Sequence, residues 1–484
     1  MTSFSHQLDI AIPGLDQHYI GSRWVEADSA DRHPVISPST EDELARVAMP
    51  TIADADRAAD AAHAAFHSGP WPKLAVEDRI DVCARLCDEL EKRLPELNRA
   101  WSLEAGPTIA HGEIINDRVG TMVWRQMLDF ARQIDWEEDR DGAMVLREPI
   151  GTALSIMTFN GPIVLMGMKV IPALLAGNTV IAKFAPESKL SSRLLAEAAE
   201  AADLPEGILS MLCADTPVTR HLVEHPRVDI VSLTGGTAIG IDVVKRTADR
   251  LARTIMELGG KSPAILLEDV NLDKALETLV GGSTGFMGQI CVNLSRVLAP
   301  KSRYNEVVDA LAAHYKAFRL GDPLSPDSDQ GPLSVERGRD RTEAYVAGAL
   351  REGADIAAGG KRPDGFDRGW WYEPTLLRAV DNQMTVAREE VFGPVTVVIP
   401  YEGDEEALAI ANDSDFGLAA SIYSQDTDRA WRMARQLQSG AVAINMAGIS
   451  FAAPFGGYKN SGWGKECGPE GILAFTQVKQ IVAG

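Results

Sequence analysis

Cysteine is scarce in this chain, and the few cysteines present form no disulfide framework. Five occur in 484 residues, an odd number scattered widely along the sequence. Small secreted domains that depend on disulfides carry many cysteines at regular spacings. We therefore expect reduced thiols and a cytoplasmic setting.

Basic residues are in the minority, with 47 Lys and Arg against 69 Asp and Glu and a formal net charge of −22. Binding to nucleic acid or to an anionic membrane surface depends on Lys and Arg, so the composition argues against both partners. Long apolar runs are also missing, because Gly, Pro or Lys interrupts each one well short of the ~20 residues that span a bilayer. Residues 1–12 lack the basic and apolar regions of a signal peptide.

The chain is long and has a globular composition. Its 484 residues are too many for one hydrophobic core and indicate two or three domains. Residues 1–50 are typical of short strands and loops, and helical spacing of apolar residues predicts helices within 52–103 and 111–134. The acidic stretch 135–142 predicts a solvated turn before an edge strand at 143–148.

From residue 151 onward the pattern alternates between strands and helices. Such alternation predicts βαβ units and a parallel sheet, in which ligands bind outside the carboxyl ends of the strands. The predicted strands cover 151–159, 179–184, 208–213 and 228–233, and the predicted helices cover 163–175, 191–202 and 218–224.

Four features follow or end these strands. Asn160 follows the first strand, Lys183 ends the second, a glycine-rich turn at 234–240 opens a helix, and Glu257 closes a short strand. A glycine-rich turn at a helix N-terminus offers free N–H groups to a phosphate. The spacing is G-x-x-x-x-G, with no G-x-G-x-x-G in the chain, so the turn alone also fits a tight turn without a nucleotide.

Cys291 ends the segment Gly288-Gln289-Ile290-Cys291, after a glycine-rich run. Glycine lets the backbone approach a ligand closely, so this thiol could meet a substrate. A single cysteine is nevertheless more often a small buried hydrophobe.

Three other patterns suggest metal sites. His221-Leu222-Val223-Glu224-His225 fits the inverted zinc-peptidase pattern H-x-x-E-H, but Pro226 follows at once and no third ligand is evident. The pairs Cys83/Cys87 and His63/His67 have helical i,i+4 spacing without further ligands. We expect core cysteines, solvated or capping histidines and no metal site.

In combination, these segments resemble the aldehyde dehydrogenase superfamily over nearly the whole chain and in the same order. The E-L-G-G-K-S-P, G-Q-x-C and E-E-x-F-G-P segments are each specific. The matching segments are Phe159-Asn160-Gly161-Pro162, Lys183, 233–240, 257–263, 288–291, 389–395, 412–423 and 454–462.

The resemblance implies a covalent mechanism. Cys291 would be the nucleophile that forms a thiohemiacetal and then a thioester, and Asn160 would hold the oxyanion together with the N–H of Cys291. Glu257 would be the general base for the thiol and for the water that hydrolyses the thioester. Lys169 and Glu466 match positions proposed as proton-relay or supporting groups, although a surface salt bridge explains each equally well.

The resemblance also implies a dinucleotide site. Lys183 would bind the adenosine ribose, Glu390 the nicotinamide ribose, and Phe392 would pack beside the nicotinamide. The remaining cofactor-binding residues would be Ile156, Met157, Thr158, Phe159, Thr234, Gly235, Gly236, Ile239, Gly240, Leu258 and Gly259.

Two positions depart from the pattern of many NAD-preferring relatives. Pro186, followed by Glu187, stands where they carry the glutamate that binds the ribose diol, and Gly236 replaces a serine of the phosphate turn. We expect NAD, with NADP possible.

The substrate tunnel is expected to be roomy and apolar. Gly161 and Met168 stand where several relatives have aromatics, and Ile290 and Val292 flank the nucleophile with apolar bulk. No Arg or Lys is evident near Cys291. We therefore expect a bulky, aromatic or terpenoid aldehyde rather than an acidic semialdehyde.

The fold implied is α/β, with a doubly wound parallel-sheet cofactor domain (1–124 and 147–257) and an α/β catalytic domain (258–452). A small β element for oligomerisation (125–146 and 466–484) predicts a homodimer or homotetramer. Two alternatives remain open: a relative that transfers the acyl group to coenzyme A, and a structural relative that has lost activity.

Overall fold

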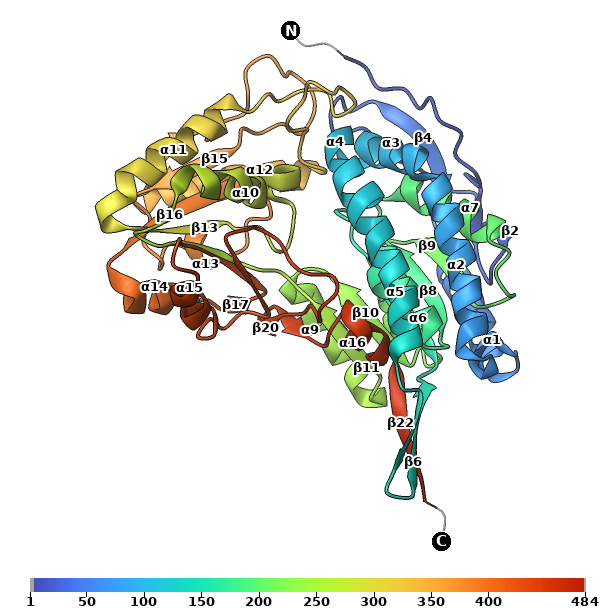
Figure 1. The fold of residues 1–484 in the computed structure, drawn as a ribbon. Coiled ribbons are helices and arrows are strands. Elements are labelled where there is room, and N and C mark those ends of the chain that lie inside the picture. The colour runs from blue at the N-terminus through green and yellow to red at the C-terminus, as the bar shows by residue number, and fades with distance from the viewer. Residues whose placement is uncertain (1–3, 483–484) are drawn as a thin grey trace.

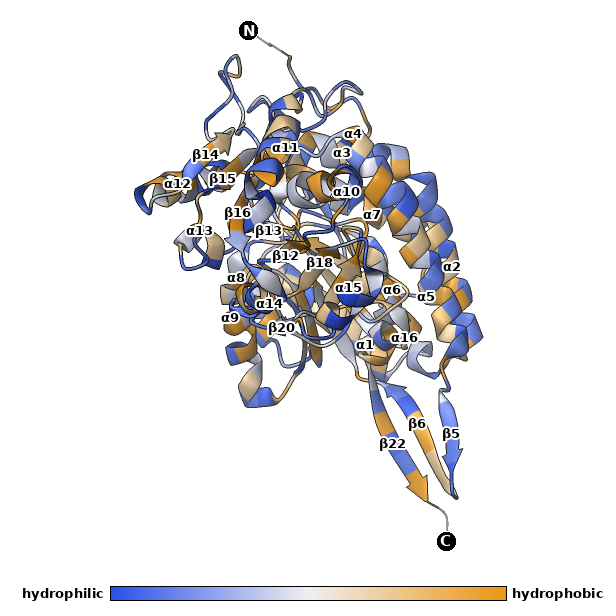
Figure 2. Cartoon of the chain, turned by 60° about the vertical axis from the view of Figure 1, so that its left-hand side comes forward, coloured by the Kyte–Doolittle hydropathy of each residue, from blue (hydrophilic) through white to orange (hydrophobic). Residues whose placement is uncertain are grey.

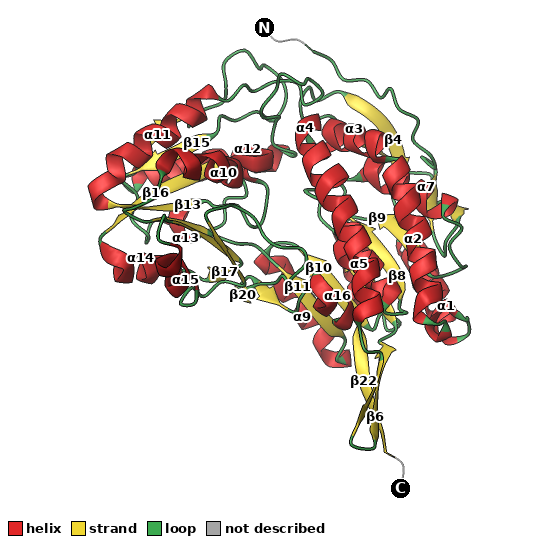
Figure 3. Ribbon diagram, in the orientation of Figure 1, coloured by secondary structure: helices red, strands yellow, loops and turns green. Residues whose placement is uncertain are grey.

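The computed structural model describes residues 4–482, which fold around two large sheets (Figure 1). Helices pack on the faces of both sheets, and a narrow β ribbon projects from the body (Figure 3). The mixed α/β fold has the expected parallel sheets. None of the helices in this range is long and apolar enough to cross a membrane.

The first sheet has the strand order β2-β1-β9-β8-β7-β10-β11-β21. The five central strands of this sheet are parallel, and they lie in the order β9, β8, β7, β10 and β11. The chain runs from β7 through β8 to β9 on one side and then returns to β10 and β11 on the other. The order therefore reverses between β7 and β10, where open α/β sheets bind ligands. The strands are β1 (Gln17–Tyr19), β2 (Trp24–Glu26), β7 (Thr152–Ile156), β8 (Thr179–Phe184), β9 (Leu209–Cys213), β10 (Ile230–Thr234), β11 (Arg253–Glu257) and β21 (Gly462–Trp463).

Alternate residues of the central strands face two separate apolar cores. Leu154 and Ile181 pack on one side of the sheet, whereas Ala153 and Val180 pack on the other. A parallel sheet covered by helices on both faces requires this continuous burial of its strands. The covering helices are α1 (Ile52–His67), α2 (Val76–Lys92), α3 (Leu94–Ala105), α4 (Ile109–Gly112), α5 (Thr121–Gln133), α6 (Ile171–Leu175), α7 (Lys189–Ala201), α8 (Thr216–Glu224), α9 (Thr237–Thr247) and α16 (Gly468–Leu473).

The second sheet has the order β14-β15-β16-β13-β12-β18-β19 and is parallel except for β14. Figure 2 shows its strands β12 and β18 as apolar and enclosed by helices. Its strands are β12 (Pro263–Leu266), β13 (Arg296–Pro300), β14 (Asp355–Ala358), β15 (Thr375–Arg378), β16 (Val395–Tyr401), β18 (Ala419–Tyr423) and β19 (Ala441–Ile444), and its helices are α10 (Leu272–Thr284), α11 (Tyr304–Ala317), α12 (Glu336–Arg351), α13 (Thr385–Arg388), α14 (Gly403–Asn412) and α15 (Thr427–Ala434).

Two short strand pairs complete the fold. One links β3 (Arg32–Ile36) to β4 (Glu43–Ala48), and the other links β17 (Phe416–Gly417) to β20 (Tyr458–Lys459).

The projecting ribbon differs from the expectation at its first strand. Residues Glu137–Arg140 are strand β5, and only Asp141 and Gly142 turn before β6 (Ala143–Pro149). Helix α5 occupies the first half of the segment 125–146 that was expected to be a hairpin. The acidic side chains of β5 are tolerated because the ribbon stands in solvent, so the strand has no apolar face to signal it. Strand β22 (Thr476–Val482) pairs along the full length of β6 (Figure 2).

Candidate active site

The register of the first sheet brings the strand-end features to one edge. Ile156 of β7 is paired with Lys183 of β8 and with Leu233 of β10, and Thr234 is paired with Glu257 of β11. The backbone N–H of Met157 donates to Lys183 O at 2.8 Å, which extends the contact beyond the strand. Residues far apart in the sequence therefore line one edge.

Asn160 follows β7 and points its amide toward the loop that carries Cys291. Its Oδ1 accepts from Thr158 Oγ1 at 2.5 Å, and its Nδ2 donates to the backbone oxygen of Gln289 at 2.8 Å. An amide nitrogen has two hydrogens, so the second can serve a ligand. The indole of Trp101 fixes the same turn by donating to Phe159 O at 2.8 Å.

The loop before Cys291 has an unusual backbone. Phe286, Met287 and Gly288 have φ of 46°, 53° and 67° in succession. A left-handed conformation is unfavourable for residues other than glycine and concentrates at functional sites. A Cβ on Gly288 would lie 2.1 Å from Gly393 O, so only glycine fits. Phe286 is held edge-on against Trp101, with 5.3 Å between ring centroids.

Cys291 is partly exposed, whereas the four other cysteines are buried. Burial, together with the negative charges of Glu390 and Glu257, raises the pKa of its thiol to about 12. The resting group is thus a protonated thiol that needs a base before it can attack a carbonyl.

Glu257, at the end of β11, is the acid placed to act as this base. Its side chain is buried, and neither carboxylate oxygen has a hydrogen-bond partner among the described residues. Burial first, and the charge of Glu466 second, raise the pKa of Glu257 well above its ordinary value. Gly456 packs against this carboxylate, since a Cβ there would lie 2.8 Å from Glu257 Oε1.

A buried polar group containing Lys169 lies next to Glu257. Lys169 Nζ contacts Glu466 Oε1 at 2.5 Å and Ser232 Oγ at 2.9 Å. Lys169 and Glu466 are fully enclosed, so the alternative of a surface salt bridge is wrong. The charge of Lys169 opposes the effect of Glu466 by lowering the pKa of Glu257.

Glu390 and Phe392 border the site from the second sheet. Glu390 Oε1 accepts from the N–H of Gly260 at 3.2 Å, and a Cβ on Gly259 would lie 2.1 Å from Oε2. Burial raises the pKa of Glu390. Phe392 meets Phe159 edge-on, with 6.1 Å between ring centroids.

The turn between β10 and α9 has the features of an anion site. Gly236 caps α9 without a side-chain hydrogen bond, and a Cβ there would meet nothing within 4 Å. The first N–H groups of a helix have no partner within the helix. Thr234 Oγ1 is buried and has no partner in the described range. Gly240 packs on Leu258, since a Cβ on Gly240 would lie 2.7 Å from Leu258 Cδ1. The side chain of Ile239 is exposed.

Pro186 lies three residues after Lys183, where many NAD-preferring relatives carry a glutamate, so this position has no acid. The next residue, Glu187, forms an ion pair with Arg337 of α12. Both Pro186 and Glu187 line a hollow of about 140 Å³ that reaches Trp370. The ammonium of Lys183 is buried, and burial lowers its pKa.

One buried basic residue lies near the loop that carries Cys291. Lys261 lines the same hollow as Ile290 and Glu390. Its side chain is 2% exposed, and burial, with the charge of Arg296 second, lowers its pKa to about 7.

The other patterns take different places. Cys83 and Cys87 are core residues, as predicted, and the rings of His63 and His67 lie 4.1 Å apart on α1. Glu224 of the H-x-x-E-H pattern forms an ion pair with Arg246 and faces away from the two histidines. Sequence reasoning gave no role to Trp101, Gln289 or Ser232, because only the folded chain brings them to the site.

The site agrees with comparisons to known proteins. The family model described as "Aldehyde dehydrogenase family" matches residues 24–481. Geranial dehydrogenase from Castellaniella defragrans is 37% identical, over 96% of this chain and 98% of the relative. A 3-succinoylsemialdehyde-pyridine dehydrogenase from Pseudomonas is 36% identical over the same shares.

Solved structures of aldehyde dehydrogenases also match the fold of this chain. An aldehyde dehydrogenase from Mycobacterium tuberculosis complexed with NAD+ has a TM-score of 0.95 at 39% identity, covering 97% of this chain and 98% of that one. Betaine aldehyde dehydrogenase from Staphylococcus aureus in complex with NAD+ has a TM-score of 0.94 at 32% identity, covering 96% and 94%. With its site geometry, this match along nearly its whole length places the chain in the aldehyde dehydrogenase family, whose members oxidise small-molecule aldehydes.

Proposed function

We propose that this protein oxidises an aldehyde to the carboxylic acid through a thioester on Cys291, with transfer of hydride to NAD. The observation that carries the proposal is the meeting of three groups. A partly exposed thiol lies beside the amide-bearing turn of Asn160 and within the field of the buried carboxylate Glu257. A nucleophile, an oxyanion donor and a base are the parts that acyl chemistry requires.

In the first step, Glu257 removes the thiol proton and Cys291 Sγ attacks the carbonyl carbon. The oxyanion of the thiohemiacetal accepts from the second N–H of Asn160 and from the backbone N–H of Cys291. Such donors contribute about 3 kcal/mol each to the stability of the transition state. When bound, the dinucleotide supplies the acceptor for the hydride that leaves this carbon.

The thioester is then hydrolysed. Glu257 first releases the thiol proton to solvent and then takes a proton from the attacking water. The bond between carbon and Cys291 Sγ breaks to release the acid, and Sγ takes up the proton from Glu257. The raised pKa of Glu257 makes its carboxylate a stronger base than an exposed one, which suits this role. Lys169 and Glu466 support this role by setting the charge around Glu257.

The cofactor assignment rests on how well the residues fit a dinucleotide. The uncapped N-terminus of α9 and the unpartnered Thr234 Oγ1 suit the pyrophosphate, and Lys183 suits the adenosine ribose. Glu390, for which Gly259 leaves room, suits the nicotinamide ribose, with Phe392 beside the ring. The rest of the proposed dinucleotide site would be lined by Ile156, Met157, Thr158, Phe159, Gly235, Ile239, Gly240 and Leu258.

NAD is favoured over NADP, although Pro186 removes the usual acid. The negative charge of Glu187 lies next to this position and is matched by Arg337. Initial rates with NAD and NADP at equal concentrations test the preference. A higher kcat/KM with NADP would contradict it.

The substrate is proposed to be a bulky apolar aldehyde. Ile290 and Val292 flank the nucleophile, and both pack against the apolar core. Lys261 offers little charge for an acidic substrate, because it is buried and its pKa is lowered. The name of the geranial dehydrogenase relative points the same way. Geranial and benzaldehyde are expected to have at least about tenfold higher kcat/KM than succinic semialdehyde, and the reverse order would contradict this.

Glu257 also favours water over coenzyme A as the acyl acceptor. A base beside the thioester activates water, whereas a thiol acceptor needs no such group. Adding coenzyme A to the reaction is therefore expected to leave the product a free acid. A coenzyme A thioester among the products would support the alternative.

The decisive assay is NADH formation with an apolar aldehyde. Cys291→Ala is expected to abolish turnover, while Cys83→Ala, which removes a buried thiol of α2, leaves it within about twofold of wild type. If Cys291→Ala kept normal turnover, the covalent mechanism would be wrong. If wild type formed no NADH with any aldehyde, the inactive relative would be the better description.

A further inference from the structure

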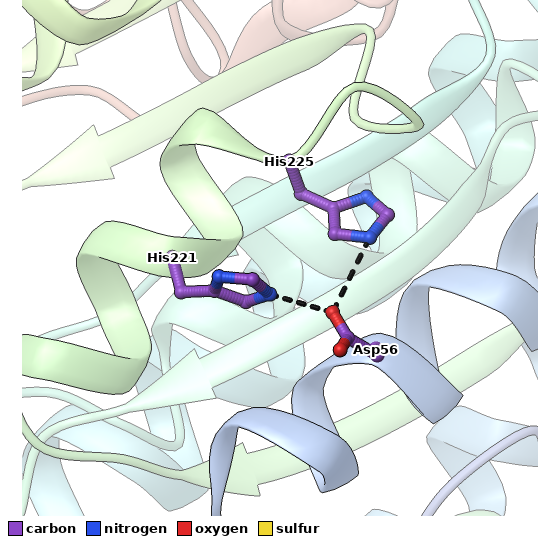
Figure 4. A group of neighbouring side chains, drawn as sticks. All are labelled: Asp56, His221 and His225. Carbon is purple, nitrogen blue, oxygen red and sulfur yellow. Dashed lines mark hydrogen bonds and ion pairs between the residues drawn. The ribbon is translucent and has the colours of Figure 1, made fainter.

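Three potential metal ligands converge outside the active site, on two helices that cover the first sheet. His221 lies in the last turn of α8 and His225 caps that helix, while Asp56 lies on α1. Figure 4 shows both imidazole rings pointing at the same carboxylate oxygen. His221 Nε2 lies 2.5 Å from Asp56 Oδ1, and His225 Nε2 lies 3.5 Å from it.

We propose that Asp56, His221 and His225 form a binding site for a divalent transition metal, with Zn²⁺ as the best fit. One ligand atom from each residue lies within 4.8 Å of the other two. Ligands around tetrahedral zinc are bound at about 2.0–2.2 Å, which separates them by roughly 3.4 Å. Opening the contact between His221 and Asp56 by about 1 Å therefore makes the site.

The donor set determines the class of metal. Two imidazoles and one carboxylate suit zinc and its first-row neighbours rather than calcium or magnesium, which prefer oxygen ligands. The side chains of Asp56 and His221 are 47% and 34% exposed, so the metal can enter from solvent and keep a water ligand.

Metal binding also requires a change at His225. His225 Nδ1 accepts from the N–H of Arg227 at 3.2 Å, so the neutral ring carries its proton on Nε2. A metal on Nε2 moves that proton to Nδ1 and displaces the contact with Arg227. Arg227 remains held by its ion pair with Asp60.

The site would have a structural role. Glu224 is turned toward Arg246, so the cluster lacks the general base of a zinc peptidase. A metal would instead join α1 to α8, the helix that leads into β10 and the turn at Thr234. The sequence showed the two histidines but not the third ligand, because Asp56 lies 165 residues before His221.

Titration with Co²⁺ tests the proposal, since the ion has visible absorption bands when bound by histidine. The full chain carrying Cys291→Ala serves as the background, which removes the active-site thiol as a competing ligand. One Co²⁺ per chain is expected, and Zn²⁺ should displace it and raise Tm by about 2–5 °C. His221→Gln, His225→Gln and Asp56→Asn should each weaken binding at least tenfold.

The matched control is His314→Ala, which removes an exposed histidine of α11 beside the second sheet. Because His314 lies outside the cluster, this variant should leave Co²⁺ affinity unchanged. The proposal is overturned if neither Co²⁺ nor Zn²⁺ binds below millimolar concentration. It is also overturned if the control loses as much affinity as the ligand variants. Circular dichroism of each variant establishes that its fold is intact.

Discussion

Cys291 and Glu257 both hold their protons more tightly than exposed groups of the same kind. Burial is the main cause for each, and a nearby negative charge adds to it. Protonation therefore limits catalysis at low pH. Each group becomes competent only as pH rises.

The first prediction concerns the pH dependence of kcat/KM. The acid limb is expected to follow the raised pKa of Glu257, so activity should rise steadily from pH 6 to pH 9 with an apolar aldehyde. Measured rates across this range check it, with Asp141→Asn as a control at an exposed acid on the ribbon. A profile that is flat from pH 6 to pH 9 would contradict the assignment.

The same shift affects stability. The folded pKa of Glu257 lies above its unfolded value, so the folded state binds more protons and stability falls as pH rises above about 4.5. Glu257→Gln removes this loss. We expect its Tm to exceed that of wild type by about 2 °C or more at pH 8, with a smaller gap at pH 5. Glu277→Gln, at an exposed acid of α10, should show no pH-dependent gap.

Among the elements, the loop between α10 and β13 determines where the thiol lies. Gly288 has φ of 67° and faces Gly393 O, and two non-glycine residues before it share the left-handed conformation. The loop is thus held by its contacts with the second sheet and with Trp101. A change in its backbone should move Cys291 relative to Asn160.

Gly288→Ala is predicted to lower kcat/KM at least tenfold and to lower Tm, because a methyl group would lie 2.1 Å from Gly393 O. Steady-state kinetics and thermal melts check this. Gly281→Ala is the control, since a Cβ there meets nothing within 4 Å and alanine favours the helix. Equal activity of the two variants would contradict the role of the loop.

The elements of the first sheet could be predicted well, because strand and helix periodicities alternate clearly from residue 151. The ribbon could not, since the acidic strand β5 buries no apolar face and has no signal of its own. The glycine-rich turn was found from its spacing. The hollow shared by Lys261 and Ile290 depends on how distant segments pack beside β12 and β13, which no local pattern contains.

For the whole molecule, the projecting ribbon is the feature that the single chain leaves unexplained. Val478, Ile481 and Val482 of β22 are exposed, and β22 is an edge strand. Exposed apolar edge strands pair with other strands unless they are protected. We propose that this ribbon joins subunits into a homodimer or homotetramer.

Val478→Lys/Val482→Lys is predicted to reduce the mass measured by light scattering to that of a smaller species. Like charges on the edge of β22 would oppose pairing between subunits. Lys479→Gln, which alters only the ion pair with Glu148, should keep the wild-type mass. A monomeric wild type at micromolar concentration would contradict the proposal.

The site as a whole could be predicted only through the resemblance of its motifs. Taken alone, Cys291 fitted an inert buried thiol, and Lys169 and Glu466 fitted a surface pair. Their enclosure beside Glu257 arises from contacts across 297 residues of sequence. Trp101 had no signal, because its contact with Phe159 O joins residues 58 positions apart in the sequence.

Intact-mass analysis of Glu257→Gln tests the central claim most directly. With NAD and an apolar aldehyde, this variant should form NADH more slowly than wild type, because the base for the thiol is missing, and should stop after about one NADH per active site. An acyl adduct should persist on Cys291, because the base that activates water is missing. Steady turnover at the wild-type rate, or NADH release without an adduct on Cys291, would contradict the account.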